Sequence, residues 1–484
     1  MPSKIFPTPD TLRDARLGIA VATTTSASIT RELAGLLGPG GVLSGDARAY
    51  LSDATESRNL RGRADAVALP KDAEQVAATV AWCYEHDVPI VPRGGGTGFT
   101  GGAVPLDGGV VLSLERLTKV RHLDPGLWRA AIEAGAITAD VRRRARENGL
   151  FYPPDPGSAE QSQLGGNIAT NAGGPHAFKY GVTGAWITGL EFVLAPGELV
   201  RVGGAIRKDV AGYDLKALMI GSEGTLGVVT AAWIKLIPAP EASLPLAAFY
   251  QDAEVGCAAI EGVLASGIVP AALEYLDEGA IAATRGAFPT PLPGDARFMV
   301  IADADGSPEE AARIHAELTE VLGEQAVAVH APTQPREVAA LWRWRDGASI
   351  AVTAQRGGKV SEDIVVPLDR LLEAIEQTVA IGRRHDLPAC SWGHAGDGNL
   401  HSTFMIDLDD PGELERAEQA AEDLFELAVA LRGSVSGEHG IGLVKNGQLS
   451  RQWAPPAIAM HEAIKRAFDP KGLLNPGKKL ARPA

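Results

Sequence analysis

Hydrophobic residues occur along the chain in two different patterns, and the change between them divides the sequence. Between residues 62 and 240, short apolar runs alternate with glycine-rich turns, which predicts brief strands and few helices. One helix is expected from Asp72 to His86, because Asp72 is a good N-cap and Glu74 adds a favourable charge to the first turn. The predicted strands here are Val67–Leu69, Ile90–Val91 and Gly109–Leu114.

From residue 246 the pattern becomes a regular alternation of strands and amphipathic helices. Strands are expected at Leu246–Tyr250, Ala271–Leu276, Phe298–Ala302, Ala326–His330, Val360–Val366 and Ala389–His394. Helices are expected at Ala253–Ser266, Pro308–Leu322 and Leu368–Arg384. Such an alternation predicts a sheet covered by helices. Pro238 and Pro240 favour a domain boundary near residue 240, and the tail from Gln452 is too short to fold alone.

Composition narrows the class of protein. A chain of 484 residues can form two or three domains. Its 60 acidic and 45 basic residues give a net charge of −15, so nucleic acid is a poor partner. Three dispersed cysteines exclude a disulfide framework and a cysteine-ligated iron–sulfur cluster. No apolar run approaches the roughly 20 residues of a membrane span, and the first residues lack the pattern of a leader peptide. We expect a cytoplasmic protein and leave open its attachment to a membrane through a partner.

Candidate chemistry is concentrated in two short motifs late in the chain. Asp397-Gly398 is a strong hairpin turn, and His394 and His401 lie three residues before and after it. Folding of this hairpin sets the two imidazoles opposite each other, about 5 Å apart at Cβ. Glu438, in a second glycine-flanked motif, can add a carboxylate and complete a set of divalent-metal ligands. The alternative to a metal site is that His394 and His401 merely pair across a sheet and that Glu438 is a solvated loop charge.

His439 directly follows Glu438 and is a candidate base. An imidazole is the usual side-chain base at neutral pH, and a metal lowers the pKa of a bound hydroxyl. The two motifs together therefore predict a site that removes a proton from a hydroxyl group.

Several glycine-rich loops predict a long ligand that carries phosphates. The first, Arg93–Gly102, follows a strand, and its glycines let backbone N–H groups approach a phosphate. Gly96, Gly98 and Gly101 match the G-x-G-x-x-G pattern, but the residues that follow cannot open a helix, so we reject a Rossmann dinucleotide site. Three more loops of small polar residues and glycine follow, at 153–158, 164–174 and 221–227.

Together these motifs resemble the flavoprotein family that includes vanillyl-alcohol oxidase. The closest resemblance is to its branch of glycolate oxidase FAD subunits, D-lactate dehydrogenases and D-2-hydroxyglutarate dehydrogenases. The resemblance extends from about Tyr50 to Lys479, and the segments Lys208–Asp214 and Gly472–Lys478 also match it. It implies an α+β fold, with an FAD-binding domain of two subdomains and an α+β cap domain that contains an antiparallel sheet. We divide the chain into an N-terminal segment (1–60), the FAD-binding domain (61–240), the cap (241–450) and a tail that returns to the FAD domain (451–484).

The resemblance also assigns the cofactor site. FAD contacts are implied for Arg93, Gly94, Gly95, Gly96, Thr97, Gly98, Gly101, Gly102, Pro154, Asp155, Ser158, Gly165, Gly166, Asn167, Thr170, Gly173, Glu223, Gly224, Val228, Val229 and Asn475. Some relatives attach FAD covalently through a histidine of the glycine-rich loop. Loop 93–102 has no histidine, so we expect FAD to be bound non-covalently.

The same branch implies the reaction. His394, His401 and Glu438 match its metal ligands, with zinc or manganese expected, and His439 matches the base. Arg345 matches an arginine that binds the substrate carboxylate, a geometry that suits a guanidinium group. Ser349 and Lys359 match further substrate positions. The implied activity is oxidation of a small D-2-hydroxy acid to the 2-oxo acid, with hydride transfer to the flavin.

The substrate and the electron acceptor are less closely defined. Ser349 and Thr403 differ from the Thr and Asn that we associate with D-2-hydroxyglutarate enzymes, which favours glycolate or D-lactate. Electrons must leave to an external acceptor or a partner redox subunit. Two alternative functions stay open: an FAD-bearing subunit that is inactive alone, and an enzyme similar to alkyl-glycerone-phosphate synthase. The oligomeric state also stays open, with a homodimer as one candidate.

Overall fold

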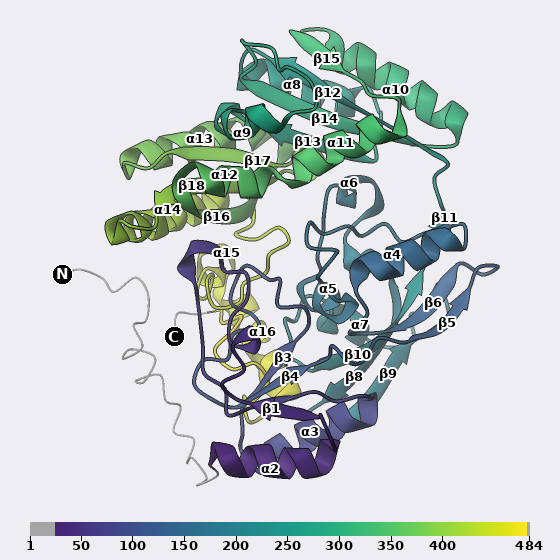
Figure 1. The fold of residues 1–484 in the computed structure, drawn as a ribbon, viewed down its shortest axis with the longest axis vertical. Coiled ribbons are helices and arrows are strands. Elements are labelled where there is room, and N and C mark those ends of the chain that lie inside the picture. Colours follow the sequence, from purple (N-terminus) through teal and green to yellow (C-terminus); the bar gives the residue numbers. More distant parts are fainter. Residues whose placement is uncertain (1–24, 482–484) are drawn as a thin grey trace.

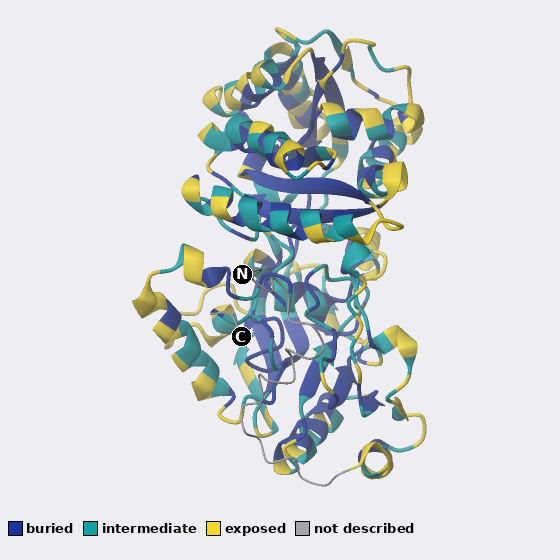
Figure 2. Cartoon of the chain, turned by 90° about the vertical axis from the view of Figure 1, so that its left-hand side faces the viewer, coloured by how far each residue is buried: buried dark blue, intermediate teal, exposed yellow. Residues whose placement is uncertain are grey.

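The computed structural model describes residues 25–481, and its described part forms two stacked lobes (Figure 1). The expectation that the chain starts without a leader peptide concerns residues 1–24, which lie outside the described part. Buried strands run through the middle of each lobe, with exposed helix faces outside them (Figure 2). No helix within residues 25–481 is long and apolar enough to cross a membrane.

Two sheets form the lower lobe. One has the order β1 (Val42–Ser44), β2 (Ala66–Ala68), β4 (Val110–Ser113) and β3 (Ile90–Arg93). The other is antiparallel, with the order β5 (Val120–Asp124), β6 (Arg129–Glu133), β10 (Val228–Lys235), β8 (Ile187–Leu194) and β9 (Glu198–Gly203). A two-stranded ribbon pairs β7 (Leu150–Phe151) with β11 (Ile237–Pro238). The helices of the lower lobe between residues 25 and 240 are α2 (Ser26–Leu37), α3 (Ala73–Glu85), α4 (Thr138–Glu147), α5 (Leu164–Thr170), α6 (Ala177–Tyr180) and α7 (Leu215–Met219).

The helix predicted from Asp72 is confirmed as α3, whose first turn is capped by the Asp72 carboxylate. Val76, Val80 and Cys83 lie three or four residues apart and are fully buried, so one face of α3 packs into the lower core. The predicted strands of this lobe are confirmed as β2, β3 and β4, and β3 extends two residues further than expected, to Arg93.

The upper lobe is built on one antiparallel sheet of seven strands. The order is β15 (Ala328–His330), β12 (Ala242–Tyr250), β14 (Phe298–Gly306), β13 (Ala272–Leu276), β17 (Ala389–His394), β18 (Asn399–Asp407) and β16 (Gly357–Val365). The first face is covered by α8 (Ala253–Ala265), α10 (Pro308–Gly323), α13 (Leu371–Arg384) and α14 (Pro411–Ala430). The second is covered in part by α9 (Glu278–Thr284), α11 (Pro335–Asp346) and α12 (Ala348–Arg356). The predicted antiparallel cap sheet is confirmed.

The rest of the second face carries polar residues. Because side chains alternate along a strand, Leu273, Leu400 and Ile364 join the apolar core of the first face. Their neighbours Glu274, His401 and Asp363 are buried and lie on the opposite face, toward the lower lobe. The sheet thus presents a polar surface where the helices leave it uncovered.

The C-terminal chain runs back from the upper lobe to the lower one (Figure 1). After α15 (Leu449–Gln452) and α16 (Pro455–Phe468), Leu474 forms a parallel bridge with Ile90 of β3. The Asn475 amide donates to the carbonyl groups of Gly102 and Glu223, at 2.9 and 2.8 Å. The tail therefore ties two glycine-rich loops together. The strands of the lower lobe precede residue 240 in the sequence, and those of the upper sheet follow it. We keep a domain boundary near residue 240 as a proposal.

Candidate active site

The hairpin of β17 and β18 brings His394 and His401 together, but its register differs from the prediction. His394 pairs with Asn399, and His401 pairs with Trp392. The connection is a short 3-10 turn, Ala395–Asp397, followed by Gly398 in the left-handed conformation. The prediction of a two-residue turn at Asp397-Gly398 was wrong, and the observed register is shifted by two residues from the predicted one. Because the side-chain period is also two, both histidines keep the same face, and their ring centroids are 5.3 Å apart.

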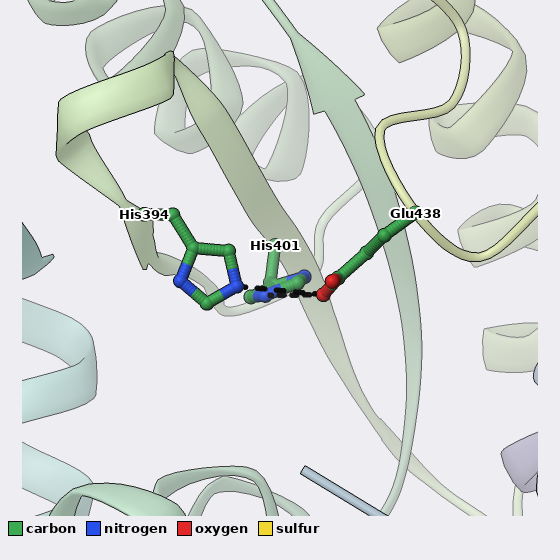
Figure 3. Close-up of side chains that lie close together, drawn as sticks. All are labelled: His394, His401 and Glu438. Atoms are coloured by element: carbon green, nitrogen blue, oxygen red, sulfur yellow. Dashed lines mark hydrogen bonds and ion pairs between the residues drawn. The ribbon is translucent and has the colours of Figure 1, made fainter. Parts of the chain in front are cut away.

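Glu438 completes a three-residue cluster with the two histidines (Figure 3). One of its oxygens lies 3.4 Å from His394 Nε2 and 3.7 Å from His401 Nε2. The three ligand atoms all lie within 4.8 Å of one another. Two imidazole nitrogens and a carboxylate that converge in this way fit a divalent cation with open coordination positions.

Electrostatics within the cluster are strongly coupled. Burial and the neighbouring His394 lower the pKa of His401 to about 3. Burial opposes protonation of His394, but the carboxylates of Glu274 and Glu438 raise its pKa well above the usual value. For Glu438, burial alone would raise the pKa, and the surrounding histidines lower it to about 2. The site therefore favours a negative carboxylate beside a neutral His401.

A buried carboxylate that sequence analysis missed, Glu274 on β13, orients this cluster. Its Oε1 lies 2.6 Å from His394 Nδ1, which leaves Nε2 directed at Glu438. Its other oxygen forms a buried ion pair with Arg345 of α11. Glu274 thus holds both a candidate metal ligand and the candidate carboxylate-binding arginine. A lone acid within the apolar run Ala271–Leu276 was the available signal, because an unpaired acid is rarely buried.

Asp363 on β16 was also missed, and it holds the loop that carries Glu438 and His439. Its Oδ2 accepts the backbone N–H groups of Gly437, Glu438 and His439 at 2.8, 2.6 and 2.9 Å. Its Oδ1 pairs with the buried Lys445 and lies 3.6 Å from His439 Nδ1. Burial opposes the charged form, but His439, Lys445 and the N–H donors hold the pKa of Asp363 well below its usual range.

The candidate base His439 lies against aromatic rings. It stacks on His401 with ring centroids 5.5 Å apart and is tilted against Phe99 at 4.6 Å. With Nδ1 near Asp363, the other ring nitrogen is available to a substrate. Phe99 belongs to the first glycine-rich loop, so this contact joins the two lobes at the site.

One cavity of about 410 Å³ connects this cluster to the glycine-rich loops. Its lining includes all four residues of the metal and base cluster as well as Arg345, Ser349 and Lys359. Most predicted FAD residues also line it: Arg93, Gly94, Gly95, Gly96, Thr97, Gly98, Gly102, Ser158, Gly165, Gly166, Asn167, Thr170, Glu223, Gly224, Val228 and Val229.

Five predicted cofactor residues lie outside the lining: Gly101, Pro154, Asp155, Gly173 and Asn475. Asp155 instead bonds to His176 at 2.5 Å. A Cβ on Gly173 would lie 2.7 Å from a Glu438 oxygen, so this glycine allows Glu438 to approach. Asn475 supports the loops from behind, through the two hydrogen bonds described above.

The cavity fits FAD by two observations. A Cβ on Gly98 or Gly166, which both line the cavity, would meet no atom within 4 Å, so glycine there keeps space for a ligand. Buried polar atoms without a partner also gather around the first loop: Asp53 Oδ1, Gln163 Oε1, Asn475 Oδ1 and Lys478 Nζ. Such atoms are costly unless a ligand or water satisfies them.

This fold and cavity define a flavin-dependent oxidoreductase, and sequence comparison agrees. The chain matches the model of the FAD-binding domain over residues 64–203 and that of the C-terminal domain of FAD-linked oxidases over residues 239–479. The chain belongs to the FAD-linked oxidase family and binds FAD.

Two relatives and one solved structure illustrate the similarity. The chain is 39% identical to the glycolate oxidase subunit GlcD of Bacillus subtilis, over 90% of this chain and 92% of that protein. It is 34% identical to a D-lactate dehydrogenase of Anaerostipes hadrus, over 86% and 90% of the two chains. In fold it resembles p-cresol methylhydroxylase with substrate bound, with a TM-score of 0.76, 18% identity and coverage of 95% and 97%.

Proposed function

We propose that this protein oxidises a small D-2-hydroxy acid, glycolate or D-lactate, to the corresponding 2-oxo acid. The observation that carries this proposal is the single cavity in which the glycine-rich loops meet His394, His401, Glu438, His439 and Arg345. The similarity to a glycolate oxidase subunit and a D-lactate dehydrogenase supports the choice of substrate.

Each group of the site has a proposed role. When bound, FAD supplies an acceptor for the hydride of the α-carbon, and a divalent cation such as zinc or manganese, held by His394, His401 and Glu438, supplies a Lewis acid. Arg345 binds the substrate carboxylate through its guanidinium group. His439 takes the hydroxyl proton, and Asp363 fixes the ring that receives it. FAD stays non-covalent, because loop 93–102 contains no histidine.

The test is anaerobic mixing of the FAD-loaded protein with glycolate, D-lactate, L-lactate and D-2-hydroxyglutarate, while the flavin absorbance is followed. We expect rapid bleaching by glycolate or D-lactate, and faster bleaching by D-lactate than by L-lactate. Metal-stripped protein should retain FAD but bleach at least about tenfold more slowly, since the hydroxyl pKa is no longer lowered. Bleaching that is unchanged after complete metal removal would contradict the metal role.

A second candidate is that the chain is the FAD-bearing subunit of a larger oxidase. It is favoured by the similarity to a protein that is itself named as a subunit. The same experiment distinguishes the two, since an isolated chain that binds FAD and metal but bleaches with no acid requires a partner or carries out a different, non-redox reaction.

A further inference from the structure

The 3-10 turn η2 (Glu56–Arg58), which belongs to the N-terminal segment, completes the open edge of the upper sheet. β16 is the last strand of that sheet, so within residues 25–481 one side of its backbone has no neighbouring strand. Ser57 Oγ accepts the N–H of Lys359 at 2.7 Å, and Glu56 Oε2 accepts the N–H of Ser361 at 3.2 Å. The turn therefore lies directly beside two residues of β16 that line the cavity.

Arg58 fixes the turn in this position. It forms ion pairs with Glu362 of β16 at 2.5 Å and with Glu418 of α14 at 2.8 Å. The Arg58 side chain is only 6% exposed, and such a buried pair is rigid because breaking it leaves a charge without a partner. The position of Glu56 relative to β16 is thus set by the fold.

Glu56 also neutralises a cation of the cavity. Its Oε1 lies 3.2 Å from Lys359 Nζ, and the Lys359 side chain is 4% exposed. The same Nζ donates to Ser349 Oγ at 2.5 Å and lies 5.1 Å from the centre of the Trp392 ring. Trp392 in turn contacts His401, with ring centroids 5.9 Å apart. Lys359 therefore lies one aromatic ring away from the candidate metal cluster.

Around the metal cluster, the other charged residues of the cavity lining are Arg345, Asp346 and Glu438. Arg345 has Glu274 as its partner, and Asp346 and Glu438 both line the same cavity. A substrate with one carboxylate can still use Arg345, because Glu274 bonds to Nη2 and the planar guanidinium carries further N–H donors. A second carboxylate further along the substrate would find Lys359 already balanced by Glu56.

We propose that Glu56 determines specificity: by neutralising Lys359, it selects 2-hydroxy acids with a single carboxylate and a short uncharged side chain, and it rejects dicarboxylates. This inference rests on the proposed function and defines its substrate class.

The test compares the wild-type protein with Glu56→Gln by anaerobic flavin reduction with D-lactate and D-2-hydroxyglutarate. The amide oxygen of Gln can still accept the Ser361 N–H, so the turn is retained while the charge is lost. We expect the ratio of reduction efficiencies, D-2-hydroxyglutarate over D-lactate, to rise about tenfold or more, because Lys359 then has its charge free for the second carboxylate. Ser57→Ala, which weakens the same turn without changing its charge, should leave the ratio as in the wild type.

Product binding gives a second readout that does not need turnover. The shift in flavin absorbance on titration with pyruvate and with 2-oxoglutarate gives two dissociation constants, and Glu56→Gln should favour 2-oxoglutarate by a similar factor. An unchanged or lower ratio in a folded Glu56→Gln protein would overturn the inference, and so would a wild-type protein that is reduced faster by D-2-hydroxyglutarate than by D-lactate. If no acid reduces the wild type, the proposed function fails, while the binding ratio still tests Glu56.

Discussion

Buried carboxylates that do not line the cavity control the geometry of the site at the scale of single residues. Glu274 holds His394 and Arg345, and Asp363 holds the loop that carries Glu438 and His439. Each has several hydrogen-bond or ion-pair partners, which offsets the cost of burying its charge. We regard both as positioning residues for the proposed chemistry.

Replacing Asp363 with Asn should slow flavin reduction about tenfold or more while FAD stays bound. The amide lacks the charge that holds Lys445 and His439, and it cannot accept the loop N–H groups as strongly. Metal content measured on the same sample should also fall, because Glu438 lies in that loop.

Glu362→Gln is the matched control for this variant. Glu362 is the neighbouring residue on β16 and lies 3.5 Å from the same Lys445, but the loop N–H groups bond to Asp363. If Glu362→Gln slows reduction as much as Asp363→Asn does, the effect comes from Lys445, from loss of the ion pair with Arg58 or from general stability, and the positioning role of Asp363 is wrong.

At the element scale, the hairpin of β17 and β18 differs in register from the sequence prediction, but the two histidines still meet. A shift of two residues replaces the direct pairing of His394 and His401 with a diagonal contact, yet both side chains stay on one face. The shift is fixed by the turn: Gly398 adopts a φ of 72°, and its carbonyl accepts the N–H of Val366 at 3.0 Å. A turn residue without a Cβ is required there.

Gly398→Ala should therefore disturb the metal site more than the same substitution at a left-handed glycine with open space around it. A Cβ at Gly398 would lie 2.1 Å from the Val366 carbonyl oxygen, so the turn must move. We expect a loss of about 2 kcal/mol or more in stability and at least about a tenfold weaker metal affinity, measured by metal titration. Gly357→Ala, with a φ of 90° but open space around its Cβ, should cost about 1 kcal/mol and leave metal affinity unchanged. Equal metal affinities in the two variants would show that the turn does not position the histidines.

At the scale of the whole molecule, charged groups tie the two lobes together on both sides of the cavity. Arg58 joins η2 to β16 and α14, as described above. On the other side, Lys179 and Tyr180 of α6 bond to Asp305 of β14, and His176 Nε2 lies 3.8 Å from Asp303. Burial alone would lower the pKa of His176, but Asp155 and Asp303 raise it to about 10.

This histidine should make stability depend on pH. Because its pKa is higher in the folded state than the usual 6.5, its contribution is fully present below about pH 6.5 and is lost as pH rises through about 10. We expect the free energy of unfolding to fall by about 2 kcal/mol or more across that range, and His176→Gln to remove most of this fall. Denaturant unfolding at pH 6, 8 and 10 measures both.

His385→Gln is the control, because the His385 ring bonds to Asp423 of α14, within the upper lobe. It should leave the pH-dependent fall in place. A His176→Gln protein with the wild-type pH dependence would show that other groups cause it.

The sequence alone determined many of the elements, the family and the main chemical groups. Apolar periodicity predicted six of the seven strands of the upper sheet and helix α3, because each depends on residues close along the chain. Glycine-rich loops predicted a long ligand that carries phosphates, which the family resemblance specified as FAD. The two histidine motifs predicted a metal cluster, because ligand chemistry depends on single residue types.

Only the tertiary structure decided how these groups are held. Glu274 is 120 positions from His394, and Glu56 is 305 positions from Ser361, so no local pattern relates them. The hairpin register depended on a turn that packs against Val366, and the lining of the cavity depended on how two lobes meet. A local sequence specifies which face a side chain occupies, but the partner it meets there is set by the packing of distant elements.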